Sequence, residues 1–156
     1  MSSPRCFQAT YKHVDEQQID VDVYLPSSQN AKSPVCTSAT ISKYIWAYCH
    51  RAVINIHGGA FMLGSSKMVN KDQVQDCLSR GWIVLAPNHR LCPQVDLLNG
   101  PIQDCRDLLA WVYDGGLERG INDTGQSTVI PDTDHVFAFG TSSGGTLALC
   151  LVSYRT

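Results

Sequence analysis

A serine near the end of the chain lies in a motif whose spacing is typical of a catalytic nucleophile. Residues 140–144 read Gly-Thr-Ser-Ser-Gly, the pattern G-x-S-x-G, with Ser142 at its centre. An apolar run over Val136 to Phe139 precedes the motif, and an apolar segment starting near Ser143 follows it. A sharp turn from strand to helix projects a serine hydroxyl above a sheet, so Ser142 is the predicted nucleophile. The alternative is a Gly-Ser turn without chemistry. The glycines that give such a turn room to form are Gly140, Gly144 and Gly145.

A second motif could stabilise the negative charge that attack by a serine creates. The residues His-Gly-Gly-Ala-Phe at 57–61 directly follow an apolar run over Ala52 to Ile56. Two glycines at the end of a strand can turn their N–H groups toward a substrate carbonyl, and a helix N-terminus adds positive potential there. The predicted oxyanion hole consists of the N–H groups of Gly58, Gly59 and Ser143. His57 is expected to be a structural histidine that fixes this loop.

The strands expected to position these motifs differ in pattern. Ile19 to Leu25 alternates apolar and polar residues, which predicts a half-buried strand with Asp20 and Asp22 on its polar face. Cys6 to Val14 is expected to pair with it as a hairpin. Three shorter runs are apolar on both faces, as in strands buried between helices of a parallel sheet. These runs are Ala52 to Ile56, Trp82 to Ala86 and Val136 to Phe139.

Helical periodicity occurs between these strands. Val74, Cys77 and Leu78 recur at helical spacing, and a longer apolar stripe covers Ile102 to Val112. Glycine and proline residues bound these helices; they are Gly81, Pro101 and Gly115. The last helix, from about Ser143, is apolar almost all round and is expected to be buried. This order predicts a three-layer α/β sandwich whose sheet is mostly parallel, with an N-terminal antiparallel hairpin.

Composition excludes several classes of protein. The chain has 156 residues, of which 44% are hydrophobic and 17% charged, which is typical of one globular domain. With a net charge of −2 and no cluster of Lys and Arg, no nucleic-acid partner is expected. Leu147 to Val152 is too short to span a membrane.

The seven cysteines contain no C-x-x-C pair, so no metal or cofactor is expected. The first twelve residues lack the apolar segment of a signal peptide, which favours a cytoplasmic protein with reduced thiols.

Together the motifs resemble the hormone-sensitive-lipase-like branch of the α/β-hydrolase fold. That branch carries an HGGG or HGGA loop, a Y-R-L-A-P-E-like stretch and a G-D-S-A-G-G elbow. Residues 57–60 read His-Gly-Gly-Ala, residues 89–94 read His-Arg-Leu-Cys-Pro-Gln, and residues 140–145 read Gly-Thr-Ser-Ser-Gly-Gly. The chain departs from the pattern at His89, at Gln94 and within the elbow. The resemblance implies a small-molecule carboxylic ester as substrate, with Ser142 as nucleophile and no cofactor. Acyl and alcohol specificity and oligomeric state stay open.

The catalytic acid and histidine of that family have no counterpart after Ser142. In the family they follow the nucleophile much later in the chain, whereas none of the fourteen residues 143–156 is Asp, Glu or His. We therefore expect residues 1–156 to be the N-terminal portion of one α/β-hydrolase domain, truncated after the elbow helix and inactive alone. Two earlier histidines are not expected to replace the missing base. His135 should lie at the end of its strand away from Ser142, and His89 takes the place that a packed tyrosine holds in the family.

Other functional classes stay open beside the esterase. A receptor-like member of the same fold would keep the serine and the glycine loop and bind a small ligand without turnover. A small interaction domain would need a sheet edge protected by charge or proline, but Val136 to Phe139 would form a bare apolar edge. The stretch from Val35 to His50 lacks periodicity, and its interpretation as an extra strand, an insertion or a translated intron is left open.

Overall fold

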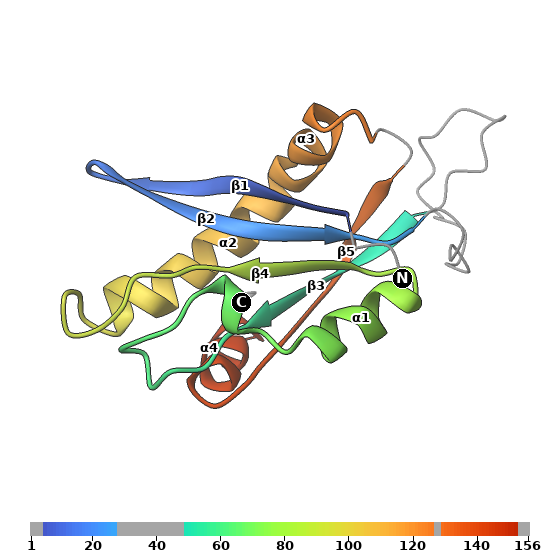
Figure 1. The fold of residues 1–156 in the computed structure, drawn as a ribbon. Helices are drawn as coiled ribbons and strands as arrows, with labels where there is room; N and C mark the ends of the chain where they lie inside the picture. Colours follow the sequence, from blue (N-terminus) through green and yellow to red (C-terminus); the bar gives the residue numbers. More distant parts are fainter. Residues whose placement is uncertain (1–4, 28–48, 127–128, 153–156) are drawn as a thin grey trace, which may run out of the picture.

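Five strands form one mixed sheet in the computed structural model, which describes residues 5–27, 49–126 and 129–152. The sheet order is β1-β2-β4-β3-β5 (Figure 1). The strands are β1 (Arg5–Val14), β2 (Gln17–Leu25), β3 (Cys49–Ile56), β4 (Ile83–Pro87) and β5 (Ile130–Gly140). The pairs β1/β2 and β2/β4 are antiparallel, and β4/β3 and β3/β5 are parallel. All strands except β2 therefore run in one direction, and the predicted N-terminal hairpin is confirmed.

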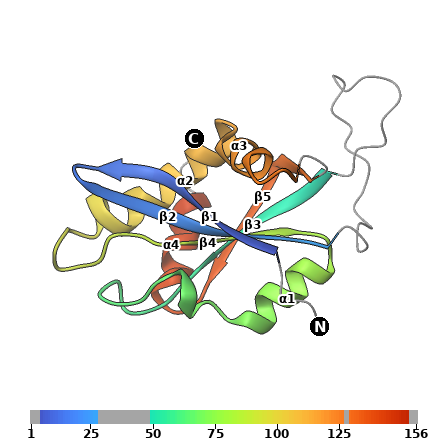
Figure 2. The ribbon, with the colours of Figure 1, turned by 45° about the horizontal axis from the view of Figure 1, so that its top comes forward.

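Helices cover both faces of this sheet. They are α1 (Lys71–Ser79), α2 (Gln103–Tyr113), α3 (Gly116–Asp123) and α4 (Ser143–Val152), with short turns η1 (Ser66–Met68) and η2 (Leu98–Ile102). Val53 of β3 packs in one cluster with α1, whereas its neighbour Ile54 packs in the other cluster with α2, α3 and α4. This division follows from the alternation of side chains along a strand. Figure 2 shows α1 and α3 on opposite sides of the sheet, so the three-layer architecture is confirmed.

Local signals account for most helix boundaries. The side chain of Asn70 accepts hydrogen bonds from the first turn of α1, and Gly81, with φ of 79°, follows the end of that helix. Gly115, with φ of 78°, separates α2 from α3. Helix α3 was not predicted, because only Leu117 and Ile121 mark its buried face and two glycines lie within it. Short helices with so few apolar positions depend on tertiary packing.

Two burial predictions are wrong, and both for reasons of packing. Helix α4 is not buried all round in the described part of the chain, since Leu149 is 73% and Val152 78% exposed. Only one side of α4 faces the sheet, and Leu147 lies on that side. Asp22, expected on an open polar face, is buried because η1 and α1 cover that face of β2, where Tyr24 packs against the cluster of α1. Its carboxylate is held by Lys67, whose Nζ lies 2.7 Å from Oδ2.

Strand β5 lies at the edge of the sheet. Within the described ranges it pairs only with β3, and the exposed ring of Phe137 stacks on Trp82 with 5.7 Å between ring centroids. The apolar edge expected from the sequence is present there.

Most of the unpatterned stretch from Val35 lies outside the described residues, and Cys49 and His50 begin β3. No helix in residues 5–27, 49–126 and 129–152 has the length and apolar character needed to cross a bilayer.

Candidate functional site

Ser142 lies on a tight turn between β5 and α4. Its φ is 55°, in the left-handed region that non-glycine residues rarely adopt, and its side chain is exposed. The Thr141 N–H donates to the carbonyl of Ile56 at 3.2 Å, and the Gly144 N–H donates to the carbonyl of Thr141 at 2.9 Å. The surrounding backbone therefore holds Ser142 in a conformation of higher energy, as is common at functional sites.

The glycines of the motif are required by close backbone contact. A Cβ on Gly140 would lie 2.6 Å from the carbonyl oxygen of Ile56. A Cβ on Gly144 would lie 2.5 Å from the carbonyl oxygen of His57 and would also collide with that of Ile56. Gly145 is less restricted, because its Cβ would be 3.2 Å from the nearest backbone oxygen. The start of α4 thus packs directly on the end of β3, which only glycine permits.

The structure brings the glycine loop after β3 against the serine turn. A Cβ on Gly58 would lie 3.3 Å from Cβ of Ser142 and 2.7 Å from the carbonyl oxygen of Thr141. Gly59 has φ of 131°, and a Cβ there would collide with the carbonyl oxygen of Leu63. Within the described part of the chain, the N–H groups of Gly58, Gly59 and Ser143 have no hydrogen-bond acceptor. Three N–H donors are therefore unpaired around this turn.

His57 lies buried beneath the glycine loop and stacks on His89. The ring centroids are 4.5 Å apart and the ring planes differ by 10°. Nδ1 of His57 is 2.7 Å from the carbonyl oxygen of Gly58, and Nδ1 of His89 is 3.0 Å from that of Arg90. Because a carbonyl oxygen only accepts, Nδ1 is the donor in both rings. Both Nε2 atoms are buried without a partner in the described residues. This geometry supports a structural role for His57.

The loop that carries His89 is anchored by a buried carboxylate. Asp104 of α2 accepts the backbone N–H of Arg90 at 2.8 Å and its guanidinium Nη2 at 2.7 Å. Lys12 of β1 donates to the same carboxylate at 2.7 Å. Burial raises the pKa of Asp104, but these hydrogen bonds outweigh it and hold that pKa below its usual range. Sequence reasoning missed this network, although a carboxylate within the apolar stripe of α2 was a signal for it.

Two exposed apolar side chains beside the glycine loop were also missed. Met62 is 57% and Leu63 56% exposed, directly after the left-handed residues Ala60 and Phe61. The signal in the sequence was a run of four apolar residues immediately after two glycines. No group of three or more metal-ligating side chains is found among residues 5–27, 49–126 and 129–152.

Burial of His89 predicts a pH-dependent stability. Burial lowers the pKa of His89 and outweighs its hydrogen bond to the Arg90 carbonyl, which raises that pKa; the stacked His57 lowers it further. As the pH falls below about 6.5, the unfolded chain protonates this histidine while the folded chain resists. We expect the free energy of unfolding to fall between about pH 7.5 and pH 5, and to fall less in His89→Tyr, which keeps a ring and does not titrate there.

Urea denaturation at several pH values measures this difference. His13→Tyr is the matched control, because His13 is an exposed histidine on β1. The wild-type protein and the control should lose stability alike as the pH falls. Parallel pH profiles for wild type and His89→Tyr would contradict the prediction.

Comparison with known proteins identifies relatives by sequence. The BD-FAE family model matches residues 47–155. The non-reducing polyketide synthase ausA of Aspergillus calidoustus is 34% identical over 134 residues, which are 86% of this chain and 5% of that protein. The non-reducing polyketide synthase atr1 of Stereocaulon alpinum is 32% identical over 143 residues, or 89% of this chain and 5% of that protein. The chain thus spans a small fraction of the length of these curated relatives.

Solved structures show the same fold. A bacterial heroin esterase superposes with a TM-score of 0.66 at 21% identity, covering 98% of this chain and 39% of that one. The butyrate-bound esterase Est2 of Thermogutta terrifontis superposes with a TM-score of 0.66 at 20% identity, covering 93% of this chain and 43% of the esterase. The chain spans less than half of either structure. The α/β-hydrolase fold predicted from the sequence is confirmed.

Proposed function

Because the chain belongs to the BD-FAE family, we propose that it carries the nucleophile and the oxyanion hole of a serine ester hydrolase. Ser142 Oγ attacks the carbonyl carbon of a carboxylic ester and forms a tetrahedral intermediate. The N–H groups of Gly58, Gly59 and Ser143 donate to the oxyanion of that intermediate. The intermediate then collapses to an acyl-enzyme with loss of the alcohol, and water releases the acid.

The contact between Gly58 and Ser142 carries this proposal. A Cβ on Gly58 would lie 2.7 Å from the carbonyl oxygen of Thr141 and 3.3 Å from Cβ of Ser142, so glycine is required there and the glycine loop lies next to the hydroxyl-bearing residue. The strained φ of Ser142 and the three unpaired N–H donors support the same assignment. A turn without chemistry would need none of these features.

The proton of Ser142 has to pass to a base. The residues 143–156 contain no Asp, Glu or His. The ring of His57 is buried and its Nδ1 proton is donated to Gly58, while His135 lies in β5 and pairs with Asp132. We propose that polypeptide outside these 156 residues supplies the base and the acid. The isolated chain should then lack triad-level activity, since an unassisted serine is a weak nucleophile.

The comparisons suggest two classes of acyl group. The structural neighbours are named esterases, and one of them holds butyrate. The curated relatives are named polyketide synthases. We propose carboxylic esters of short or medium acyl chains as the primary substrates, with polyketide acyl groups as the second class to assay. Binding of such esters without turnover would instead indicate a receptor-like role.

Covalent labelling of Ser142 tests the proposal. A neighbouring esterase of Thermogutta terrifontis is described as phosphorylated by paraoxon, so the same reagent is the appropriate probe. In a protein where this chain is joined to a segment supplying Asp and His, paraoxon should modify Ser142 and abolish ester hydrolysis together. Peptide mass spectrometry locates the adduct. Modification at another residue, or hydrolysis that survives full modification of Ser142, would disprove the assignment.

A further inference from the structure

The loop after β4, residues 88–92 (the β4 loop), holds residues 58–66 of the glycine loop in place. In the described part of the chain, the two hydrogen bonds that join residues 58–66 to another segment both go to the β4 loop. In the first, the Cys92 N–H donates to the carbonyl of Phe61 at 2.8 Å. In the second, Oδ1 of Asn88 accepts a backbone N–H of the glycine loop at 2.8 Å. The place of the glycine N–H groups therefore depends on the β4 loop.

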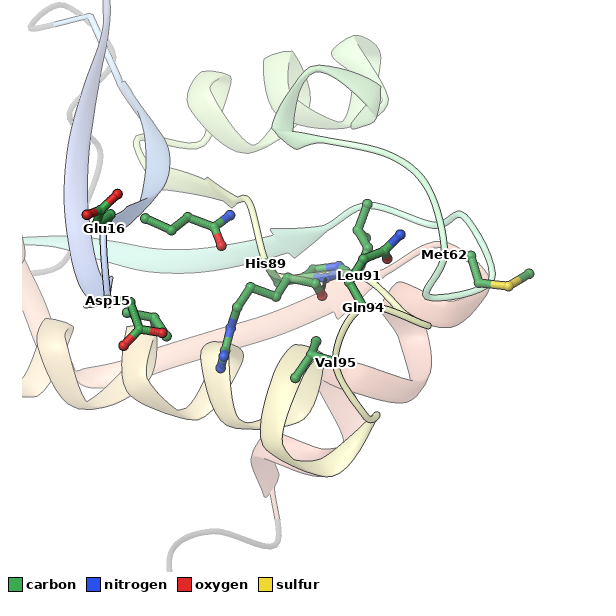
Figure 3. A pocket seen from close by; sticks show the side chains of 10 residues that line it. Asp15, Glu16, Met62, His89, Leu91, Gln94 and Val95 are labelled. Carbon is green, nitrogen blue, oxygen red and sulfur yellow. Dashed lines mark hydrogen bonds between the residues drawn. The ribbon is translucent and has the colours of Figure 1, made fainter.

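Side chains join the same two loops. His89 of the β4 loop stacks on His57, the residue that begins the glycine loop. Figure 3 shows His89 and Leu91 between the turn after β1 and Met62 of the glycine loop, with which they line one pocket. Because both backbone bonds and a ring contact connect the loops, a displacement of the β4 loop acts on the glycine loop.

One buried carboxylate holds the middle of the β4 loop. Asp104 of α2 is fully buried. It accepts the Arg90 N–H at 2.8 Å and the guanidinium of Arg90 at 3.0 Å from Nε and 2.7 Å from Nη2. Lys12 of β1 donates to the same carboxylate at 2.7 Å. The Tyr11 hydroxyl holds only the start of the loop, at the carbonyl of Asn88. Asp104 thus fixes the segment between the two bonds to the glycine loop.

We propose that Asp104 is a positioning residue for the oxyanion hole. It fixes the backbone of Arg90, which lies two residues before Cys92, and the Cys92 N–H in turn holds the glycine loop. The N–H groups of Gly58 and Gly59 are thereby kept beside the nucleophile. A distant change that displaces such groups by about 1 Å can cost about 10²-fold in rate. The inference rests on the proposed oxyanion hole, on which Asp104 acts only through the two loops.

Steady-state kinetics on the protein joined to a segment supplying Asp and His test this role. Asp104→Asn keeps the size of the side chain and one oxygen acceptor but removes the charge that holds the guanidinium. It should lower kcat about tenfold and change KM less than about threefold, because the displaced donors act mainly on the transition state. Paraoxon titration of Ser142 counts the active sites, so a smaller folded fraction does not mimic a lower kcat.

The two cations on this carboxylate separate positioning from stability. Lys12→Met removes a cation that is not part of the β4 loop, so it should lower the free energy of unfolding and leave kcat within about twofold. Arg90→Met leaves Asp104 paired with Lys12 and should lower kcat about tenfold, as Asp104→Asn does. It replaces Asp104→Asn if that variant does not fold. Arg90→Lys keeps the charge and should recover part of the loss.

Amide hydrogen exchange on the 156-residue chain gives a readout that does not need activity. In Asp104→Asn the Cys92 N–H should exchange about tenfold faster relative to that of Ile54, which lies in β3 between β4 and β5. Lys12→Met should leave this ratio unchanged. An unchanged ratio in Asp104→Asn, or kcat values that fall equally in Lys12→Met and Asp104→Asn, would overturn the inference. Wild-type protein that paraoxon does not label would instead disprove the hydrolysis proposed above, whatever the exchange ratio.

Discussion

Replacing Ser142 by alanine is expected to lower kcat/KM for short p-nitrophenyl esters by about 10⁴-fold or more. The protein to assay is one in which this chain is joined to a segment supplying Asp and His. The expected loss is large because the variant has no group that can form the acyl-enzyme, while the oxyanion donors and the fold are retained. Stopped-time assays with p-nitrophenyl acetate and butyrate measure the change.

The adjacent serine supplies a matched control. Ser143 is assigned a role only through its backbone N–H, which alanine retains, so Ser143→Ala should keep most of the activity. Its side chain lies at the start of α4 and is buried. If Ser143→Ala were the inactive variant and Ser142→Ala the active one, the elbow assignment would be wrong by one residue. Full activity in both variants would remove the serine mechanism altogether.

Replacing Gly59 by alanine should lower kcat about 10²–10³-fold with little change in KM. The new Cβ would collide with the carbonyl oxygen of Leu63, and φ of 131° is unfavourable for alanine. The loop must therefore shift and turn its N–H groups away from Ser142. Because these donors act mainly on the charge that develops in the transition state, the rate should suffer more than substrate binding.

Gly125 offers a comparison free of this collision. It also has positive φ, 75°, but an added Cβ would meet nothing within 4 Å. Gly125→Ala should therefore cost some stability and leave kcat unchanged. Steady-state kinetics on both variants, with circular dichroism to verify the fold, separate the effects. A raised KM at unchanged kcat for Gly59→Ala would place the loop in ground-state binding instead.

Strain at Ser142 connects these two predictions. A residue held at φ of 55° costs free energy that the surrounding contacts must offset. The hydrogen bonds of Thr141 to Ile56 and of Gly144 to Thr141 supply part of that compensation. The turn and the glycine loop are both held at the end of β3, so a substitution that moves the backbone of one motif, as Gly59→Ala does, acts on the other.

Several elements could be predicted from the sequence because their signals are local. Alternation over Ile19 to Leu25 marked β2, and the helical stripe from Ile102 to Val112 marked α2. The G-x-S-x-G motif at 140–144 located the turn, because glycines there have to accommodate close backbone contact. Helix α3 was not predicted, because two apolar residues do not establish a helical period.

By itself, the sequence determined the kinds of element, their order and the two glycine motifs, because periodicity and backbone freedom depend on near neighbours in the chain. Only the tertiary structure decided that Gly58 lies against Ser142 and that His57 stacks on His89. It also decided that Asp104 anchors the loop of Arg90. These contacts join residues on different strands and helices, and they form because parallel strands end at one edge of the sheet. Pairing between distant residues depends on how the layers pack, which no local pattern encodes.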